Sequence, residues 1–316
     1  RKCLAQTGHQ YPKKGVSLLC TRTQIEHQLI ETLHKEAIPV SQLCRVLDIC
    51  CSAYYAAKQR QAKPRICALT PYIKAAFESS GKTYGSRRMV KAMANKGFKI
   101  GRYKIRSLMH KNQLKTVWKR RFTHTTDSKH GLPIAENILN RDFKPEAHNK
   151  AFGCDITYIR TLAGWLYLAV VIDLFSRKVV GWAMAPSMPA HLVCEALNMA
   201  IQTRRPNAGL IVHSDRGSQY ASAEYQALLN QYGFVCSMSR KGNCWDNAVT
   251  ERFFLSLKME RVWQGRYANY AEAERDIVNY IVGFYNTERL HSTLGYVSPA
   301  AYELKMLKNT PVECLI

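Results

Sequence analysis

The stretch Leu-Ile-Val-His-Ser-Asp-Arg-Gly, residues 210–217, decides the fold of this chain. It is a short apolar run that ends in an acid, Asp215, and such a run is typical of a buried strand whose last residue reaches the end of a sheet. Upstream, residues 152–159 (Phe-Gly-Cys-Asp-Ile-Thr-Tyr-Ile) alternate as a strand does. On that strand Asp155 faces away from Cys154 and its alternate neighbours. The sequence therefore predicts two core strands, each with one acid.

The order of the elements around these strands predicts an α/β core. A turn-like segment at residues 161–164 is followed by an apolar run, so the strands on either side of it form a hairpin. Three strands, a helix, a strand, a helix, a strand and a helix is the order of a ribonuclease H-like fold, a mixed five-stranded sheet with helices. In this fold Asp155 and Asp215 lie on neighbouring strands. The predicted strands are 152–159, 165–174, 178–184, the run that ends at Asp215, and 235–238, and the predicted helices are 189–203, 223–232 and 247–262.

A third acid, Glu251, lies in the last of these helices, with 35 residues between it and Asp215. At about 100° per residue, Phe253 and Leu257 fall on the side of the helix away from Glu251. Lys258 falls almost directly above Glu251. These two charged residues are therefore expected to share one face.

Three carboxylates that meet at strand ends and on a helix would repel one another and raise at least one pKa unless a cation neutralised them. Hard oxygen ligands without Cys or His spacing favour Mg²⁺ or Mn²⁺ over zinc. Two such ions can stabilise the attacking and leaving oxygens of an in-line phosphoryl displacement. Asp155, Asp215 and Glu251 therefore indicate a two-ion site that cuts or joins nucleic acid.

Four ordered motifs carry a family resemblance. They are Asp-Ile-Thr-Tyr-Ile from Asp155, His-Ser-Asp-Arg-Gly-Ser-Gln-Tyr at residues 213–220, Trp-Asp-Asn-Ala-Val-Thr-Glu-Arg-Phe-Phe at residues 245–254, and Arg-Leu-His-Ser-Thr-Leu-Gly-Tyr with Asn286 before it and Ser298-Pro299 after it. With a lysine seven residues after the Glu, they resemble the DDE transposases of bacterial insertion sequences, most closely the second reading frame product of the insertion sequence three family, whose catalytic core is similar to retroviral integrase.

The resemblance covers roughly residue 40 to the C-terminus and implies several properties. Asp155, Asp215 and Glu251 would be the catalytic and metal-binding residues. The partners would be the terminal inverted repeats of the element and target DNA, bound by a homo-oligomer that transposes through a circular intermediate. Two positions depart from the family's pattern: Phe152 replaces a common Trp, and Arg252 replaces a common Ser. Phe152 can fill the same aromatic core position, whereas Arg252 either contacts DNA or weakens metal binding.

The basic charge of the chain is concentrated in its first half. The net charge is +23, and residues 1–150 carry 30 Lys and Arg against 9 Asp and Glu, whereas residues 151–316 carry 16 against 14. A polyanion that contacts the first half would release counterions, which adds salt-sensitive affinity. The charge therefore predicts DNA binding by that half.

The 11 cysteines form no Cys-x-x-Cys pair, which argues against both a disulfide framework and a structural zinc site. Most are expected to be reduced core residues, an interpretation that we favour over a metal or redox pair at Cys50-Cys51. No apolar run reaches about 18 residues and no signal peptide is evident. We therefore expect a cytoplasmic, nucleoid-associated bacterial protein without membrane contact.

The chain divides into six predicted segments. The first lacks periodicity and an initiating Met, so we expect that the sequence begins inside a longer product or carries foreign residues. The second forms either a helix-turn-helix or an ordinary helical hairpin. The segments are 1–22, unassigned; 23–66, helical; 67–122, a three-helix basic DNA-binding domain; 123–150, a linker; 151–265, the ribonuclease H-like catalytic core; and 266–316, a C-terminal helical segment.

The segment 67–122 predicts helices at residues 71–79, 86–95 and 102–112, delimited by Ser and Gly. Basic residues remain outside the apolar face of the third helix, and others follow it. Which of them contact bases rather than phosphates stays open. The residues expected to bind DNA are Arg87, Arg88, Arg102, Lys104, Arg106, Lys119, Arg120 and Arg121, together with Arg252 and Lys258 of the catalytic helix.

Several residues near the acids also have simpler interpretations. Asp173 and Asp246 lie near the apolar core and are interpreted as turn or capping residues. His213 is either a core histidine or a neighbour of the acids, and Lys258 either reaches solvent or contacts a phosphate. Residues 245–247 are expected to form a mobile loop beside the site.

The hypothesis that follows is a DNA transposase that hydrolyses a strand at the end of its element and joins the freed 3′-hydroxyl to another phosphodiester. One alternative is a metal-dependent nuclease that does not join. Another is a DNA-binding protein whose acids are unused. A retroelement integrase would share the core, but the sequence has no His-His-Cys-Cys zinc spacing near its N-terminus.

Overall fold

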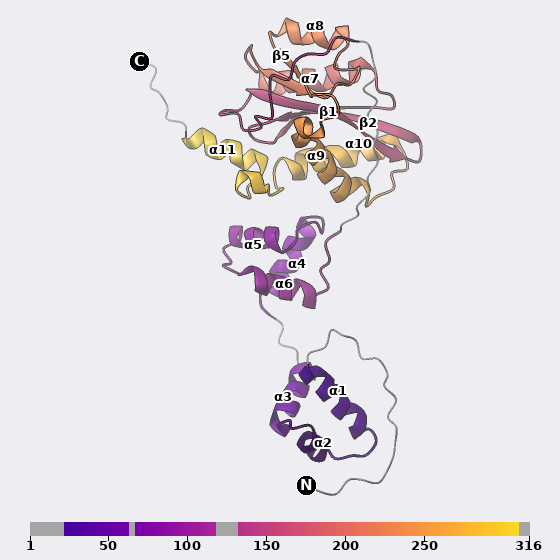
Figure 1. Cartoon of the computed structure of the whole chain (residues 1–316), viewed down its shortest axis with the longest axis vertical. Helices are drawn as coiled ribbons and strands as arrows, with labels where there is room; N and C mark the ends of the chain where they lie inside the picture. Colours follow the sequence, from indigo (N-terminus) through magenta and orange to yellow (C-terminus); the bar gives the residue numbers. More distant parts are fainter. Residues whose placement is uncertain (1–21, 63–66, 118–131, 310–316) are drawn as a thin grey trace. The chain divides into compact units, whose positions relative to one another are not determined.

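A computed structural model describes residues 22–62, 67–117 and 132–309 (Figure 1). The chain divides into two compact units, one up to Ala68 and one from Leu69 onward. In the part that the structure describes, no helix is both long enough and apolar enough to span a bilayer. Of the seven cysteines whose side chains are described, all are free, and only Cys44, Cys154 and Cys194 are buried, so the expectation that most cysteines are core residues is met only in part.

The first unit is a small three-helix cluster. Its core contains Ile30, Leu43 and Tyr54, which are almost fully buried. Asp48 has a positive φ of 55° in the turn between the second and third helices. This arrangement agrees with both interpretations of the segment, so DNA binding by it stays a prediction. The helices are α1 (Arg22–His34), α2 (Val40–Val46) and α3 (Cys51–Ala62).

Three further helices open the second unit, within a residue or two of their predicted bounds. Ile73, Phe77, Met89, Met93 and Ile105 are almost fully buried, which shows why the apolar spacing produces this cluster. The second of the three is capped by the backbone at residue 85 rather than by a serine side chain. The helices are α4 (Thr70–Ser79), α5 (Ser86–Asn95) and α6 (Arg102–Lys111).

Residues 132–150 form no regular helix or strand, as predicted for a linker, but they pack on the core. Leu139 is 4% exposed, and its amide donates to Ser237 Oγ at 3.1 Å. At the end of the linker Ile211 N donates to the Lys150 carbonyl at 3.1 Å. The described part of the linker is therefore fixed along the sheet.

The second unit contains the predicted mixed five-stranded sheet. The strand order is β3-β2-β1-β4-β5, in which β1, β2 and β3 are antiparallel neighbours and β4 is parallel to both β1 and β5. The strands are β1 (Ala151–Thr161), β2 (Gly164–Asp173), β3 (Val179–Ala185), β4 (Ile211–Ser214) and β5 (Val235–Met238).

Helices cover both faces of the sheet (Figure 1). The helices α7 (Ala190–Arg204) and α8 (Ala223–Gln231) lie on one face, where Phe152, Val171 and Leu197 form part of the main core. A Cβ at Gly181 of β3 would lie 2.1 Å from the Ala196 carbonyl oxygen, so only glycine allows α7 to approach this closely. The helix α9 (Ala248–Leu257) lies on the other face and packs against β1.

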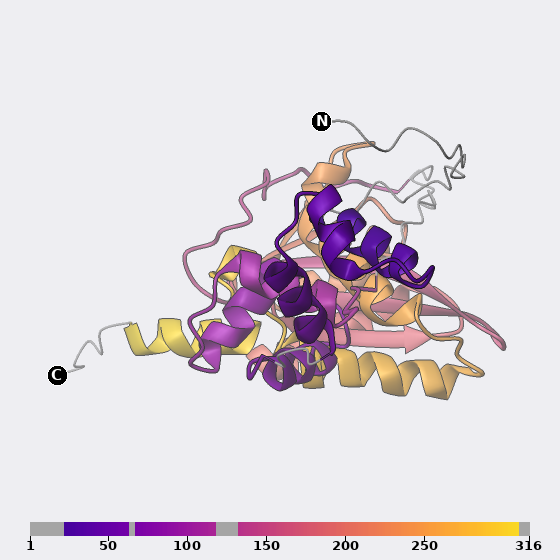
Figure 2. The ribbon, with the colours of Figure 1, turned by 90° about the horizontal axis from the view of Figure 1, so that it is seen from below.

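The predicted helix 247–262 and the predicted C-terminal helical segment are both interrupted. The helical turn widens to the π form after α9 and again after α10 (Tyr270–Asn279), and a further helix, α11 (Pro299–Asn309), ends the described part of the segment. In Figures 1 and 2 α10 and α11 are separate helices at different ends of this segment. The amide side chain of Asn286 fixes the segment to β3 by bonding both the N–H and the carbonyl of Val179 at 3.0 and 2.9 Å. The π turns are η2 (Lys258–Val262) and η3 (Tyr280–Tyr285), and the 3₁₀ turns are η1 (Cys244–Asn247) and η4 (Ser292–Leu294).

Candidate active site

Two acids are brought opposite each other by the register of parallel strands. The strands β1 and β4 pair as far as Gly153 opposite His213. Asp155 comes two residues after Gly153, and Asp215 comes two residues after His213, so both acids lie equally far beyond the last paired residues. Because β4 ends at Ser214, both acids lie where the two strands stop pairing. The predicted adjacency of these two strands is confirmed.

Nearby backbone amides set the orientation of both carboxylates. Ile156 N donates to Asp155 Oδ1 at 2.8 Å, and Gly217 N donates to Asp215 Oδ1 at 2.9 Å. A Cβ at Gly217 would lie only 3.0 Å from that same oxygen of Asp215. The Asp-Arg-Gly motif therefore forms a tight turn whose amide also stabilises the charged form of the acid.

The third acid, Glu251, is carried by α9, which packs on β1 through its opposite side. Phe253 and Leu257 are buried, as the helical spacing predicted, whereas Glu251 is exposed. Gly153 of β1 permits the close approach of the helix, because a Cβ there would lie 3.2 Å from Thr250 Cγ2. The packing of α9 on β1 thus brings Glu251 near Asp155, the fifth residue of that strand, and near Asp215, which directly follows β4.

The three acids and Lys258 are near enough to change one another's pKa. Burial raises the pKa of Asp155 well above its ordinary value, and the charges of Asp215 and Glu251 raise it further. Lys258 acts on Asp155 in the opposite direction. Partial loss of solvation and the charge of Asp215 also raise the pKa of Glu251, although the residue as a whole is exposed. Such mutual shifts are the effect of like charges in one site, and they favour the binding of a cation.

The donor atoms fit a magnesium ion whose ligands are completed by water and substrate. Carboxylate oxygens suit a hard divalent cation. Across residues 22–62, 67–117 and 132–309, no three His, Cys, Asp or Glu side chains lie close enough to hold a metal ion by themselves. Mg²⁺ is usually bound through one or two carboxylates together with substrate phosphates, so an incomplete set of protein ligands is compatible with it. Metal binding by Asp155, Asp215 and Glu251 stays a prediction.

Lys258 lies between the acids and an aromatic ring. Its Nζ is 4.6 Å from the centroid of the Tyr158 ring. Burial lowers its pKa, and the charge of Asp155 opposes that shift. The half-buried ammonium group is therefore part of the acid cluster, a position that favours the prediction of phosphate contact over a lysine that only reaches solvent.

Arg252 follows Glu251 in the sequence, but its charge acts on groups other than the three acids. Its side chain is exposed, and its charge contributes to the lowered pKa of Arg88 and of His291. The raised pKa of Glu251 comes from burial and from Asp215. The structure thus gives no support to weakened metal binding by Arg252, and DNA contact remains the prediction for it.

The structure separates the basic residues predicted on α5 and α6 into groups. Four of them are exposed, namely Arg87, Arg102, Lys104 and Arg106. Arg102 and Arg106 line a cavity of about 870 Å³ on this helical domain. The side chain of Arg88 is only 23% exposed, and its Nη1 lies 3.9 Å from Glu260 Oε1. The remaining residues of the prediction, Lys119, Arg120 and Arg121, lie outside the described residues.

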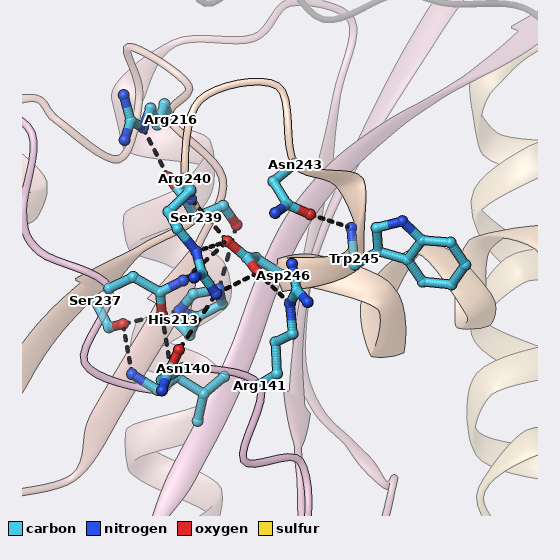
Figure 3. Close-up of polar contacts among 12 residues, drawn as sticks. Asn140, Arg141, His213, Arg216, Ser237, Ser239, Arg240, Asn243, Trp245 and Asp246 are labelled. Atoms are coloured by element: carbon cyan, nitrogen blue, oxygen red, sulfur yellow. Dashed lines mark hydrogen bonds and ion pairs between the residues drawn. The ribbon is translucent and has the colours of Figure 1, made fainter.

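A buried carboxylate, Asp246, ties the turn before α9 to the core (Figure 3). Its oxygens accept hydrogen bonds from Arg240 Nε at 2.9 Å, Arg141 Nε at 2.7 Å and Asn137 Nδ2 at 2.9 Å. The bond from Arg240 is the largest of the effects that hold the pKa of Asp246 well below its ordinary value. Residues 245–247 therefore belong to a fixed turn, η1, rather than to the mobile loop that the sequence suggested. Sequence gave no signal for this role, because Arg141 is 105 residues away.

Two other polar residues near the acids are structural. His213 is a core histidine: its Nδ1 lies 2.9 Å from Ser237 Oγ and its Nε2 lies 3.2 Å from Ser239 Oγ. Burial lowers its pKa to about 4, so the ring is neutral at pH 7. Asp173 is a turn residue as interpreted, since its Oδ1 accepts from the Phe175 amide at 2.8 Å.

The ion pairs of Asp246 predict a pH-dependent stability. Because folding lowers the pKa of this acid from its ordinary 3.8, the stabilisation is present above that value and is lost as the pH falls toward the lower folded value. We expect Asp246→Asn to cost about 1–2 kcal/mol at neutral pH, since the arginine partners are half exposed and screened by solvent. Urea unfolding from about pH 7 to about pH 2.5 should show this cost shrinking below about pH 4. Asp142, the exposed residue after Arg141, is the control. A loss of stability in Asp246→Asn that does not depend on pH, or an equal loss in Asp142→Asn, would contradict the role of the Asp246 ion pairs.

Residues of the C-terminal motif fix the turn that follows α9. Arg289 donates from Nη2 to Glu260 Oε1 at 2.7 Å and from Nε to Glu260 Oε2 at 2.8 Å. Tyr280 Oη donates to the same carboxylate at 2.7 Å, and Arg289 Nη2 also donates to Ser256 Oγ at 3.0 Å. Because Glu260 belongs to η2 and Ser256 to α9, this buried network holds the two together beside Lys258.

Family models match three parts of the chain. The model for an integrase core domain matches residues 145–244, a second integrase core domain model matches residues 232–299, and the model for an HTH-like domain matches residues 67–122. Among solved structures, the HTLV-2 integrase catalytic core domain in complex with magnesium is similar with a TM-score of 0.41 and 16% identity. That likeness covers 51% of this chain and 99% of the other.

Known proteins resemble the chain over almost its whole length. The insertion element IS600 uncharacterized 31 kDa protein of Shigella sonnei is 42% identical over 266 residues, which are 83% of this chain and 98% of that protein. Transposase InsF for insertion sequence IS3A of Escherichia coli (strain K12) is 39% identical over 281 residues, which are 87% of this chain and 97% of that protein. With an HTH-like domain before an integrase core of the ribonuclease H-like fold, the chain belongs to the transposases of the insertion sequence three family.

Proposed function

We propose that this transposase cuts and joins DNA ends by metal-assisted phosphoryl transfer at Asp155, Asp215 and Glu251. The observation that carries the proposal is the mutual effect of these acids on their pKa values, although they come from three separate elements. Repulsion of this kind costs stability in the absence of a cation, and clusters that retain it are typical of functional sites. We assign Mg²⁺ or Mn²⁺, as two ions, to these oxygens.

The proposed reaction has two displacements at phosphorus. In the first, water attacks the phosphodiester at the end of the element, the bond from phosphorus to the 3′-oxygen breaks, and a 3′-hydroxyl is left. In the second, that hydroxyl attacks another phosphodiester, and the new P–O bond forms as the bond from that phosphorus to its own 3′-oxygen breaks. The attacking hydroxyl gives its proton to solvent, and the leaving 3′-oxygen takes a proton from solvent. Bound divalent ions would activate the attacking oxygen and neutralise charge that develops on the phosphate.

The chain itself supplies orientation and charge. The amides of Ile156 and Gly217 keep the two aspartates turned in fixed directions, which lowers the entropy cost of gathering the reactants. Lys258, next to Asp155, would hold a non-bridging phosphate oxygen. Glu251, on α9, would face the phosphate from the side opposite the strands.

Binding of DNA is proposed for the helical domain and for the ends of the core. The exposed Arg87, Arg102, Lys104 and Arg106 provide the charge that steers a polyanion, and the cavity beside α6 offers a contact surface. We propose the terminal inverted repeats and target DNA as the partners and a homo-oligomer as the active form. A cytoplasmic protein associated with the nucleoid would meet both DNA partners.

A labelled terminal-repeat duplex, incubated with the full chain and Mg²⁺, tests the proposal. We expect nicking at the end of the element followed by joined product, and neither when the ion is removed with EDTA. Nicks without joined product would support a nuclease instead. Tight, salt-sensitive binding without any strand cleavage would contradict the catalytic proposal altogether.

A further inference from the structure

Trp245 is a large aromatic side chain exposed beside the candidate active site. It is 70% exposed. Within the described part of the chain its indole makes no ring contact or side-chain hydrogen bond, and Figure 3 shows it directed away from the cluster around Asp246. An aromatic ring in water forgoes the stabilisation that its burial would provide. A single exposed apolar residue is ordinary on a protein surface, so the neighbours of Trp245 and the charges around it decide whether its ring meets a partner.

The backbone on both sides of Trp245 is fixed. Its own amide donates to Asn243 Oδ1 at 3.2 Å. Asp246 is fully buried by its bonds to the arginines, and Asn247 is 6% exposed with its Nδ2 3.5 Å from the Cys154 carbonyl oxygen. The backbone that carries the indole is therefore held in place before any partner binds, which reduces the entropy cost of a contact there.

The position of this turn places the indole near the proposed point of cutting. Cys154, whose carbonyl Asn247 contacts, directly precedes Asp155 on β1. The turn η1 leads without a break into α9, which carries Glu251 six residues after Trp245. The turn that carries Trp245 therefore contacts the strand of Asp155 and leads into the helix of Glu251.

The charges around the turn favour a nucleic acid as the partner. The guanidinium groups of Arg141 and Arg240 share a single carboxylate, that of Asp246, so this cluster keeps a net positive charge. Both arginine side chains are partly exposed, at 43% and 49%. Two arginines bound to the turn that carries an exposed ring suit a nucleotide. Its phosphate can contact the guanidinium groups while its base stacks on the indole. Only a base that has left the duplex stack presents its flat face in this way.

We propose that Trp245 stacks on an unpaired nucleobase next to the phosphate that is cut at the DNA end. The inference rests on the proposed function in one respect, since it takes the acid cluster as the place of cutting. Stacking of this kind would hold the strand end open and keep the scissile phosphate among the acids. It would also make cleavage easier for ends whose terminal pairs are already broken.

Cleavage of two DNA substrates tests this role of Trp245. The first is the fully paired terminal repeat, and the second has the bases beside the cut left unpaired. We expect Trp245→Ala to slow cleavage of the paired end by about 10- to 100-fold, the range of one base–aromatic stack, and to regain most of the rate on the unpaired end. Trp245→Phe should stay within about 3-fold of the unchanged protein, since a smaller ring still stacks. Tyr232→Ala, which removes an exposed aromatic after α8, is the matched control and should leave both rates unchanged.

A second measurement reports stacking without any reaction. Terminal-repeat DNA that carries 2-aminopurine beside the cut is bound in EDTA, where stacking on the indole should quench its fluorescence in the unchanged protein but not in Trp245→Ala. Unchanged quenching in Trp245→Ala, or equal slowing of paired and unpaired ends, would overturn the inference. If the unchanged protein fails to cleave with Mg²⁺, the proposed function fails, while the fluorescence still decides whether Trp245 stacks.

Discussion

Replacement of Asp155 by Asn is expected to abolish strand cleavage and to stabilise the folded protein at the same time. The pKa of Asp155 is raised in the folded protein by burial, Asp215 and Glu251, so its charge at neutral pH costs stability. Asn is isosteric, can still accept the hydrogen bond from Ile156 N, and removes the repulsion. Cleavage should fall by at least about 1,000-fold, because the charge stabilisation that metal ligands support is worth several kcal/mol and each 1.36 kcal/mol is a tenfold change in rate.

Thermal unfolding without divalent ions and cleavage with Mg²⁺ measure the two effects on Asp155→Asn. The melting temperature should rise by about 2–4 °C for each kcal/mol of repulsion that is relieved. Glu195→Gln removes one exposed negative charge on α7, across the sheet from Glu251, and should change neither quantity much. An active Asp155→Asn protein, or one that is markedly less stable, would show that the acids do not form a mutually repelling catalytic cluster.

The second large effect is expected at Arg289, whose loss should destabilise the second unit by about 3–5 kcal/mol. Arg289 is 3% exposed and Glu260 9%. Burial alone would lower the pKa of Arg289, but Glu260 outweighs it and raises the pKa. Arg289→Ala would leave the Glu260 carboxylate buried with only Tyr280 in hydrogen-bond contact and a more distant Arg88, which is far costlier than the loss of an exposed pair.

Urea unfolding of three proteins separates this explanation from a general loss of packing. The double replacement Glu260→Leu with Arg289→Leu should recover most of the stability, because it leaves no buried charge unpaired. Glu78→Gln breaks the exposed Lys82–Glu78 pair, in which the side chains are 54% and 60% exposed, and should cost less than about 1 kcal/mol. A double variant as unstable as Arg289→Ala would contradict the charge argument.

Loss of this network should also disturb the position of Lys258 in the candidate active site. Lys258 lies in η2 with Glu260, two residues away, and Arg289 bonds both Glu260 of that turn and Ser256 of α9. We therefore interpret the C-terminal motif as a support for the catalytic helix. The motif carried the family resemblance in the sequence. Its supporting role depends on the contact between Arg289 and Glu260, which only the tertiary structure shows.

Local patterns in the sequence were sufficient for the elements of the core. The alternation around Asp155, the apolar run before Asp215 and the helical spacing of Phe253 and Leu257 each depend on neighbours within a few residues. Their order predicted the mixed sheet and the pairing of the two acidic strands, both of which are confirmed. The helix bounds were less accurate at Lys258, where the turn widens to the π form without a signal in the sequence.

The sequence by itself determined the family and the order of the core elements and indicated three candidate acids, because these depend on short periodic patterns and motifs. The tertiary structure alone decided which charges meet. It placed Arg141 on Asp246, turned Arg88 toward Glu260, and fixed the turn that the sequence suggested was mobile. The physical reason is that electrostatic and hydrogen-bond partners lie within about 3 Å in space. In this chain they can be 105 residues apart, a separation that no local pattern encodes.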